Sequence, residues 1–238
     1  MNVRVEPLSA KLKAITLTDR GVVTSVKIRA FHAGKVPRKV AEMMSEAAKA
    51  AVAAEPELAS AKVEVEVQVV TESSAVGNGC GLLLVATTTT GCVFGGSALG
   101  KPKIKAVTTG EAAANELLAA LRHGGCVDEW LQDQLILFMA LAEGTSEMIT
   151  GALTLHTKTA IMHATELCGA SFDVEPLTSA PSGGGDGGGG GGGGGMGAAG
   201  DGNGGSSDSK PTAYGQAGKE EGRFLIRCRG IGHESTRT

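Results

Sequence analysis

Aromatic residues are scarce in this chain. They make up 3% of its 238 residues, with one tryptophan and one tyrosine, while hydrophobic residues make up 42%. That hydrophobic share is typical of a globular protein, so the core has to be built from valine, leucine, isoleucine, alanine and methionine. The length allows one large domain or two smaller ones, with ample material for a buried core.

Long hydrophobic runs and paired cysteines are also absent. No apolar stretch reaches the length of a membrane-spanning helix, and residues 1–6 do not have the pattern of a secretory signal. The five cysteines are odd in number, widely separated and free of any Cys-x-x-Cys pair. This arrangement indicates reduced thiols in an intracellular protein and argues against a disulfide framework or a zinc site.

Charges of the two signs nearly balance, leaving a net charge of −3. Their distribution is uneven, because residues 1–40 carry nine basic and two acidic residues, a net +7 that leaves −10 for the remainder. A basic segment can attract the phosphate backbone of RNA. It can equally consist of strands whose lysines are solvated on their outer face, and the sequence alone favours this second interpretation.

The first part of the chain has the pattern of a small mixed sheet with one helix. Val63–Val69 alternates between hydrophobic and polar residues without a fault, which predicts a strand with one solvated face. An amphipathic helix is predicted over 36–54, with Pro37 in its first turn. Its expected apolar face consists of Val40, Met43, Met44, Ala47 and Ala51. The other elements predicted here are strands at 22–31, 82–88 and 92–94, and a tight turn with positive φ at Gly77–Gly79.

From Gly110 onwards the pattern is mainly helical. Residues 111–122, 128–142 and 157–168 are expected to form helices, and 171–174 and 223–229 strands. In the last strand Phe224, Ile226 and Cys228 share one face. Residues 181–209 are almost pure glycine with serine, aspartate and asparagine, which predicts a disordered linker. A glycine-rich phosphate loop is rejected, because no helix follows and no lysine stands at the required spacing.

The helix over 128–142 carries polar groups on an apolar background. Its expected interior follows helical spacing through Val127, Trp130, Leu131, Leu135, Phe138 and Leu141. Asp133 and Gln134 interrupt that strip and need partners, because unpaired buried polar groups are costly. His156 stands at the start of the next helix, where backbone N–H groups favour anionic ligands. A ring, hydrogen-bonding groups and an imidazole together suggest nucleotide chemistry.

Several segments of the sequence resemble those of a known protein family. The matching pieces, in chain order, are residues 17–21, 77–79, 90–94, 121–125, 127–134, 138–142, 153–161 and 228–232. Together they resemble the RNA 3'-terminal phosphate cyclases in their eukaryotic form, over nearly the whole chain apart from the glycine tract. Several long matches in one order are far more specific than a single short pattern.

The resemblance implies an α/β (α+β) fold, in which a large domain of βαββ-type units contains a smaller inserted α/β domain. Residues 1–14 would end a large-domain segment, and 15–105 would form the inserted domain. Residues 106–178 would return to the large domain, 179–220 would be the glycine-rich linker, and 221–238 would add the last strand and a tail.

The resemblance also implies a ligase-type enzyme that uses ATP and Mg²⁺ to convert RNA 3'-phosphate ends to 2',3'-cyclic phosphates, with the nucleus as its expected location. His156 would be the nucleophile that carries AMP. The ATP-contacting segment would be Trp130, Leu131, Gln132, Asp133 and Gln134, with no metal ligand supplied by the protein. Tryptophan at 130 departs from the family's usual tyrosine, so a hydrogen bond made by the phenol would be lost while stacking on adenine is retained.

Simpler interpretations accompany each of these assignments. His156 alone would be a capping or solvated residue, Trp130 alone a packing anchor, and Asp133 a partner for a nearby base. His123 and Cys126 could suggest a metal, but two candidate ligands without a second pair make a weak case. No role is expected for His32 or His163.

Two further alternatives concern the whole chain. The family's N-terminal portion, with its Glu-Gly-Gly-Gly-Gln-type loop, has no match here, which predicts a truncated product or a fragment that is inactive or weakly active alone. A related branch consists of non-catalytic rRNA-processing factors without the nucleophilic histidine, and the presence of His156 favours the catalytic branch. A plain RNA- or protein-binding module is the remaining possibility.

Overall fold

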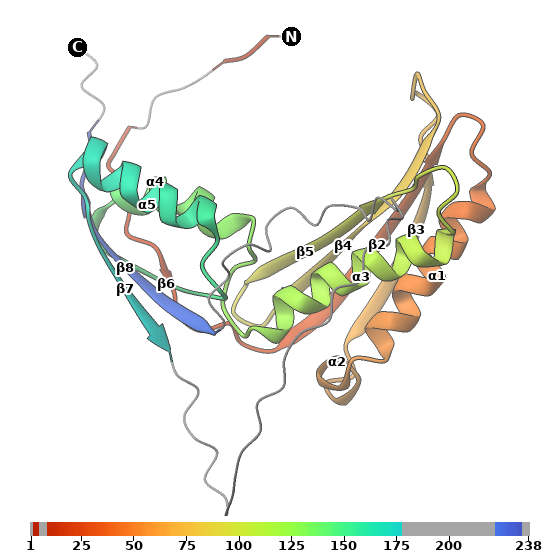
Figure 1. The fold of residues 1–238 in the computed structure, drawn as a ribbon, viewed down its shortest axis with the longest axis horizontal. Coiled ribbons are helices and arrows are strands. Elements are labelled where there is room, and N and C mark those ends of the chain that lie inside the picture. The colour runs from red at the N-terminus through yellow and green to blue at the C-terminus, as the bar shows by residue number, and fades with distance from the viewer. Residues whose placement is uncertain (1, 5–8, 178–221, 235–238) are drawn as a thin grey trace, which may run out of the picture.

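The structure, a computed structural model, describes residues 2–4, 9–177 and 222–234. It consists of two α+β layers, each a four-stranded sheet with helices on one face (Figure 1). The two layers lie side by side, and the chain passes from the first to the second after Arg122. The predicted fold class is therefore confirmed. The glycine tract and its predicted disorder lie outside the described residues.

The first layer has the strand order β3-β2-β4-β5. Its elements are β2 (Val23–Ala33), α1 (Arg38–Ala53), α2 (Pro56–Ser60), β3 (Glu64–Thr71), β4 (Gly79–Thr88), β5 (Val93–Leu99) and α3 (Ala106–Arg122). β2 and β3 are parallel and the other neighbours antiparallel. A parallel pair needs a crossover, which α1 supplies, and α1 and α3 cover the same face of the sheet (Figure 1).

Burial along these elements follows the predicted alternation in the strands but not in the helix. β3 alternates between exposed and half-buried positions as expected, and Ile28, Leu84 and Phe94 fill the core. In α1 the buried positions are Ala41, Met44, Ser45, Ala48 and Val52. Of the predicted apolar face only Met44 is fully buried, so the buried face of α1 lies about one position further along the chain than predicted.

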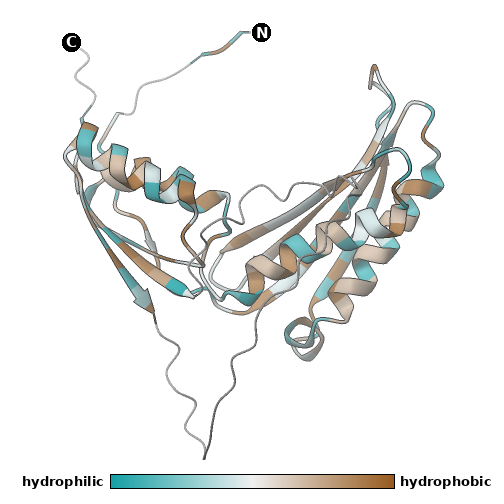
Figure 2. Ribbon diagram, viewed as in Figure 1, coloured by the Kyte–Doolittle hydropathy of each residue, from teal (hydrophilic) through white to brown (hydrophobic). Residues whose placement is uncertain are grey.

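The second layer has the strand order β1-β6-β8-β7, covered by two helices. Its elements are β1 (Thr16–Leu17), α4 (Leu131–Leu141), β6 (Glu143–Thr150), α5 (Leu155–Cys168), β7 (Ser171–Leu177) and β8 (Arg223–Ile231). Phe224, Ile226 and Cys228 are all buried, which confirms their shared face, and hydropathy alternates along β7 (Figure 2). β6 was not predicted, because alternate burial begins only at Ser146 in this strand.

The boundary between the two layers differs from the expected one. Residue 105 was expected to end the inserted domain, but α3 packs against α1 and β5, and its buried leucines belong to the first core. The chain passes to the second layer only after Arg122. An alanine- and leucine-rich helix carries no sequence signal for which of two neighbouring cores it joins.

Acidic residues from elsewhere in the fold pair with the basic first segment. Ion pairs join Lys11 to Glu143, Arg20 to Glu57, Lys27 to Glu66, Arg29 to Glu72 and Arg38 to Glu42. The net charge of +7 is therefore largely compensated in space, which agrees with solvated outer faces better than with a phosphate-binding surface. Within the described residues, none of the helices has both the length and the apolar character needed to cross a bilayer.

The predicted tight turn at Gly77–Gly79 is not found: Gly77 lies in a bend, Gly79 already begins β4, and neither has a positive φ. Among the described residues near it, Gly34 has the left-handed φ, at +62°, and the Lys35 N–H donates to the Asn78 side chain. Pro37 likewise is not in the first turn of α1 but precedes it in an extended conformation. Both corrections concern how a loop enters an element, which tertiary hydrogen bonds decide.

Close packing of β5 on α3 yields a stability prediction. A Cβ added at Gly96 would lie 2.7 Å from the Leu117 nitrogen and closer still to the Ala113 carbonyl oxygen, both rigid backbone. Gly96→Ala should lower the free energy of unfolding by about 2 kcal/mol, because the helix must be pushed off the strand. At Gly95 the nearest atom is 3.9 Å away, so Gly95→Ala is the matched control. Urea unfolding followed by circular dichroism measures both, and equal midpoints would contradict the prediction.

Candidate active site

Helix α4 turns a different face inward from the one predicted. Its buried residues are Gln132, Ile136, Met139 and Ala140. Trp130 is 55% exposed and Phe138 48% exposed, so neither belongs to the helix interior. The prediction was wrong because helical spacing alone did not fix which side of the helix faces inward: it placed Asp133 and Gln134 on the buried strip, whereas Gln132 occupies it.

Gln132 is buried because its amide finds a complete set of partners. Its Nε2 donates to Thr150 Oγ1 at 3.0 Å and to the Ala152 carbonyl at 3.4 Å. Its Oε1 accepts from Thr157 Oγ1 at 2.6 Å and from the Thr154 N–H at 3.3 Å. Two donors and two acceptor positions are all used, so the side chain has no capacity left for a ligand. It instead links α4, the end of β6 and the start of α5.

His156 occupies the second position of α5 and is exposed. Thr154 caps this helix, with its Oγ1 accepting from the Thr157 N–H at 3.1 Å. The residues on either side of the imidazole, Leu155 and Thr157, are exposed and buried respectively, so the helix start is anchored while the ring faces solvent. The first-turn N–H groups and the helix dipole make this end favourable for phosphate.

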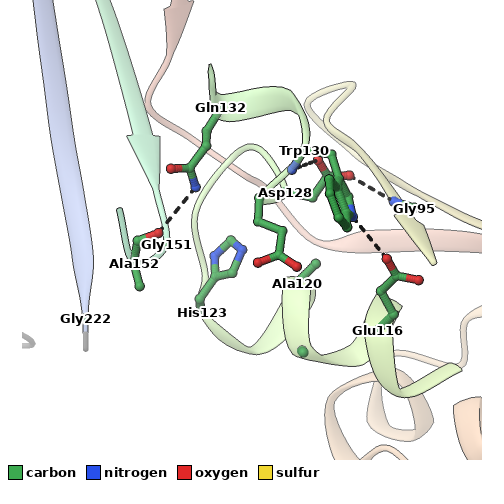
Figure 3. A pocket seen from close by; sticks show the side chains of 12 residues that line it. Gly95, Glu116, Ala120, His123, Asp128, Trp130, Gln132, Gly151, Ala152 and Gly222 are labelled. Carbon is green, nitrogen blue, oxygen red and sulfur yellow. Dashed lines mark hydrogen bonds between the residues drawn. The ribbon is translucent and has the colours of Figure 1, made fainter. Parts of the chain in front are cut away.

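Trp130 lies where the two layers meet. Its indole Nε1 donates to Glu116 Oε1 of α3 at 3.0 Å (Figure 3). Asp128 Oδ1 accepts from the backbone N–H groups of Trp130 and Leu131, at 3.1 and 2.8 Å, and so caps α4. Asp128, three residues before Leu131, had a capping signal in the sequence. Glu116 had none, because its partner is fourteen residues away on another element.

A cavity of about 290 Å³ opens beside these residues (Figure 3). Polar groups from both layers line it, namely Glu116, His123, Asp128, Glu129, Trp130 and Gln132, and small residues complete the wall. None of the described residues that line it is lysine or arginine. A carboxylate-lined cavity disfavours phosphate, so a nucleotide's phosphates would have to lie elsewhere.

The other residues of the predicted ATP-contacting segment have separate surroundings. Leu131 and Asp133 are half-buried, whereas Gln134 is exposed and its Nε2 donates to the Trp130 carbonyl at 2.8 Å. Asp133 and Gln134 were expected to interrupt the buried strip of α4, but the buried polar residue in that strip is Gln132. The structure brings Trp130 and Gln132 to one cavity and joins Gln132 to the residues flanking His156.

The suggested metal pair of His123 and Cys126 is not supported by its surroundings. His123 Nδ1 accepts from the Gly125 N–H at 2.9 Å, and its ring packs edge-on near Phe94. Burial, together with the neighbouring Cys92, raises the pKa of the Cys126 thiol to about 12, which opposes the thiolate that metals require. Within the part of the chain that the structure describes, no cluster of three or more histidine, cysteine or acidic residues could hold a metal ion.

Comparison with known proteins agrees with this geometry. The family model for the insert domain of RNA 3'-terminal phosphate cyclases matches residues 18–122, the same span that packs as the first layer. A probable RNA 3'-terminal phosphate cyclase of Dictyostelium discoideum is 37% identical over 185 residues, 77% of this chain and 42% of that protein. The RNA 3'-terminal phosphate cyclase of Drosophila melanogaster is 38% identical over 170 residues, 71% and 46% of the two chains.

An archaeal relative extends the similarity. The RNA 3'-terminal phosphate cyclase of Pyrobaculum aerophilum is 35% identical over 158 residues, 66% of this chain and 43% of that protein. The chain thus spans less than half the length of these curated relatives. The insert-domain match coincides with a packed layer, and relatives from three distant organisms are similar over much of the chain, so the chain is similar to the RNA 3'-terminal phosphate cyclases.

Proposed function

We propose that this protein acts in the ATP-dependent conversion of RNA 3'-phosphate ends to 2',3'-cyclic phosphates, through a histidine–AMP intermediate on His156. The observation that carries the proposal is the exposed imidazole at the anchored start of α5. The names of the relatives give the reaction class. ATP, Mg²⁺, an RNA partner and a nuclear location all belong to this proposal.

The reaction would proceed in three displacements at phosphorus. An imidazole nitrogen of His156 attacks the α-phosphorus of ATP, and pyrophosphate leaves. An oxygen of the RNA 3'-phosphate then attacks the same phosphorus, and the imidazole departs. Finally the 2'-hydroxyl attacks the 3'-phosphorus, loses its proton and releases AMP as the ring closes. A phosphate monoester lacks a good leaving group, and the transferred AMP provides one.

The surroundings of the side chains on α4 and next to it suggest a role for each of them in nucleotide binding. The exposed face of Trp130 is free to stack on a base, and Asp133 and Gln134 lie on the accessible side of α4. Gln132 holds the start of α5 rather than touching the nucleotide, since its amide is fully engaged. Mg²⁺ would be bound mainly by the nucleotide's own phosphates, and it would neutralise their charge as a second anion approaches.

Labelled ATP tests this proposal directly. The purified chain is incubated with Mg²⁺ and ATP labelled at either the α- or the γ-phosphate, and protein-bound label is counted. The expected result is acid-labile label from the α-position only, discharged by RNA with a 3'-phosphate. Label from neither position, together with retained RNA binding, would point to the non-catalytic rRNA-processing branch and overturn the proposal.

A further inference from the structure

The ring of Trp130 is held by the first layer, although α4 belongs to the second. The carboxylate that accepts its indole N–H comes from Glu116, in the middle of α3. The other oxygen of that carboxylate, Oε2, accepts the Ser97 N–H of β5 at 2.7 Å. Glu116 is thus fixed from the strand side and presents one oxygen to the indole.

The main chain of Trp130 is held in a parallel way. Asp128 Oδ1 accepts from the Trp130 and Leu131 N–H groups, and its Oδ2 accepts from the Gly95 N–H at 3.3 Å. β5 is the edge strand of its sheet, and Gly95 and Ser97, two residues apart, direct their N–H groups away from β4. Two carboxylates therefore satisfy the free donors of an edge strand and hold both the backbone and the ring of Trp130.

We propose that Glu116 is a positioning residue, which fixes the Trp130 ring in the orientation used for nucleotide binding and so makes the first layer part of the nucleotide site. The claim that the ring contacts a nucleotide rests on the proposed function. The claim that Glu116 holds the ring does not depend on it. An exposed indole with two free side-chain torsions would otherwise sample several rotamers, and freezing it on binding would weaken affinity. The single hydrogen bond removes that freedom beforehand.

The single tryptophan of the chain makes the proposal measurable without a label. Fluorescence of the full chain, excited at a wavelength that tyrosine does not absorb, reports only Trp130, so acrylamide quenching and anisotropy report the exposure and mobility of its ring. Glu116→Ala should raise quenching and lower anisotropy, and Glu116→Gln, which keeps one acceptor oxygen, should fall between. Glu111→Ala is the matched control, because Glu111 is an exposed residue of the same helix and does not line this cavity.

A second measurement links the ring to the nucleotide. Binding of ATP in the presence of Mg²⁺, followed by calorimetry, should weaken about tenfold in Glu116→Ala and less in Glu116→Gln, the range expected for losing a hydrogen bond to a charged acceptor. Trp130→Phe, which keeps an aromatic face but has no N–H, should lose affinity similarly, and adding Glu116→Ala to it should cost nothing more. Circular dichroism melts confirm that each variant is folded.

The outcomes separate the two proposals. Unchanged quenching and anisotropy in Glu116→Ala would overturn the positioning role whatever the nucleotide does. A freed ring with unchanged ATP affinity would also overturn it, as would additive losses in the double variant. If the wild-type chain binds no ATP, the proposed function fails, and the fluorescence measurements alone then decide whether Glu116 holds the ring.

Discussion

Replacing His156 by alanine should abolish transfer of label from α-labelled ATP to the protein, lowering the rate by at least about a thousandfold. The proposed phosphoramidate bond forms on the imidazole itself, so removing the ring removes the attacking nitrogen; the amine of Lys158, exposed two residues further on in α5, is not expected to replace it. The stability of the fold should change by no more than about 0.5 kcal/mol, because the side chain is exposed. Autoradiography of the denatured protein and a melting curve measure the two quantities.

The same helix supplies a matched control for this substitution. His163 is also an exposed histidine of α5, two turns further on, and lies away from the capped end of the helix. His163→Ala should keep full labelling. Label retained in His156→Ala and lost in His163→Ala would move the nucleophile, and label retained in both would remove the histidine intermediate altogether.

Gln132→Leu should destabilise the fold by about 3 kcal/mol, since it leaves two threonine hydroxyls, a carbonyl and an N–H without their buried partner. Leucine fills a similar volume, so the loss reports the hydrogen bonds rather than a cavity. We expect the melting temperature to fall by roughly 6–12 °C for a chain of this size. Differential scanning calorimetry of both proteins at one pH measures the shift.

A second glutamine in α4 tests whether the loss of stability comes from burial of the amide or from the change of residue type. Gln134 lies two positions along α4, is exposed, and makes one bond to the Trp130 carbonyl. Gln134→Leu should shift stability by about 0.5 kcal/mol or less. Labelling of His156 should fall in Gln132→Leu even at temperatures where the variant is fully folded, because the start of α5 loses its anchor. A variant as stable as wild type would show that the network contributes nothing.

Strands with regular alternation were readily predicted from the sequence. β3 alternates between exposed and half-buried positions, and β8 between half-buried and buried ones as far as Cys228, in agreement with the predicted faces. β6 was missed because its first three residues are all exposed and its pattern covers only the second half. Periodicity reports the contrast between two faces, so an element with no contrast over part of its length gives a weak signal.

The roles predicted for the site residues stay predictions, but their surroundings differ in part from those expected. His156 is exposed at the start of α5, whereas Trp130 lies outside the helix interior in which it was expected, and Gln132 rather than Asp133 or Gln134 is the buried polar residue. Helical spacing identifies a strip of apolar side chains, yet it cannot foresee that an amide will meet four partners from other elements. Glu116 was missed for the same reason, since its two hydrogen bonds join α3 to Ser97 of β5 and to Trp130.

The sequence alone was enough to predict the α+β class, most of the helices and strands, and the resemblance to the cyclases. Hydropathy patterns and long motifs are properties of neighbouring residues, so they can be read without the tertiary structure. Tertiary structure alone decided that α3 joins the first layer, that the basic segment is matched by distant acids, and that an amide anchors the start of α5. These outcomes depend on hydrogen bonds and packing between residues far apart in sequence. Such interactions form only when folding brings the elements together, so no local sequence pattern reports them.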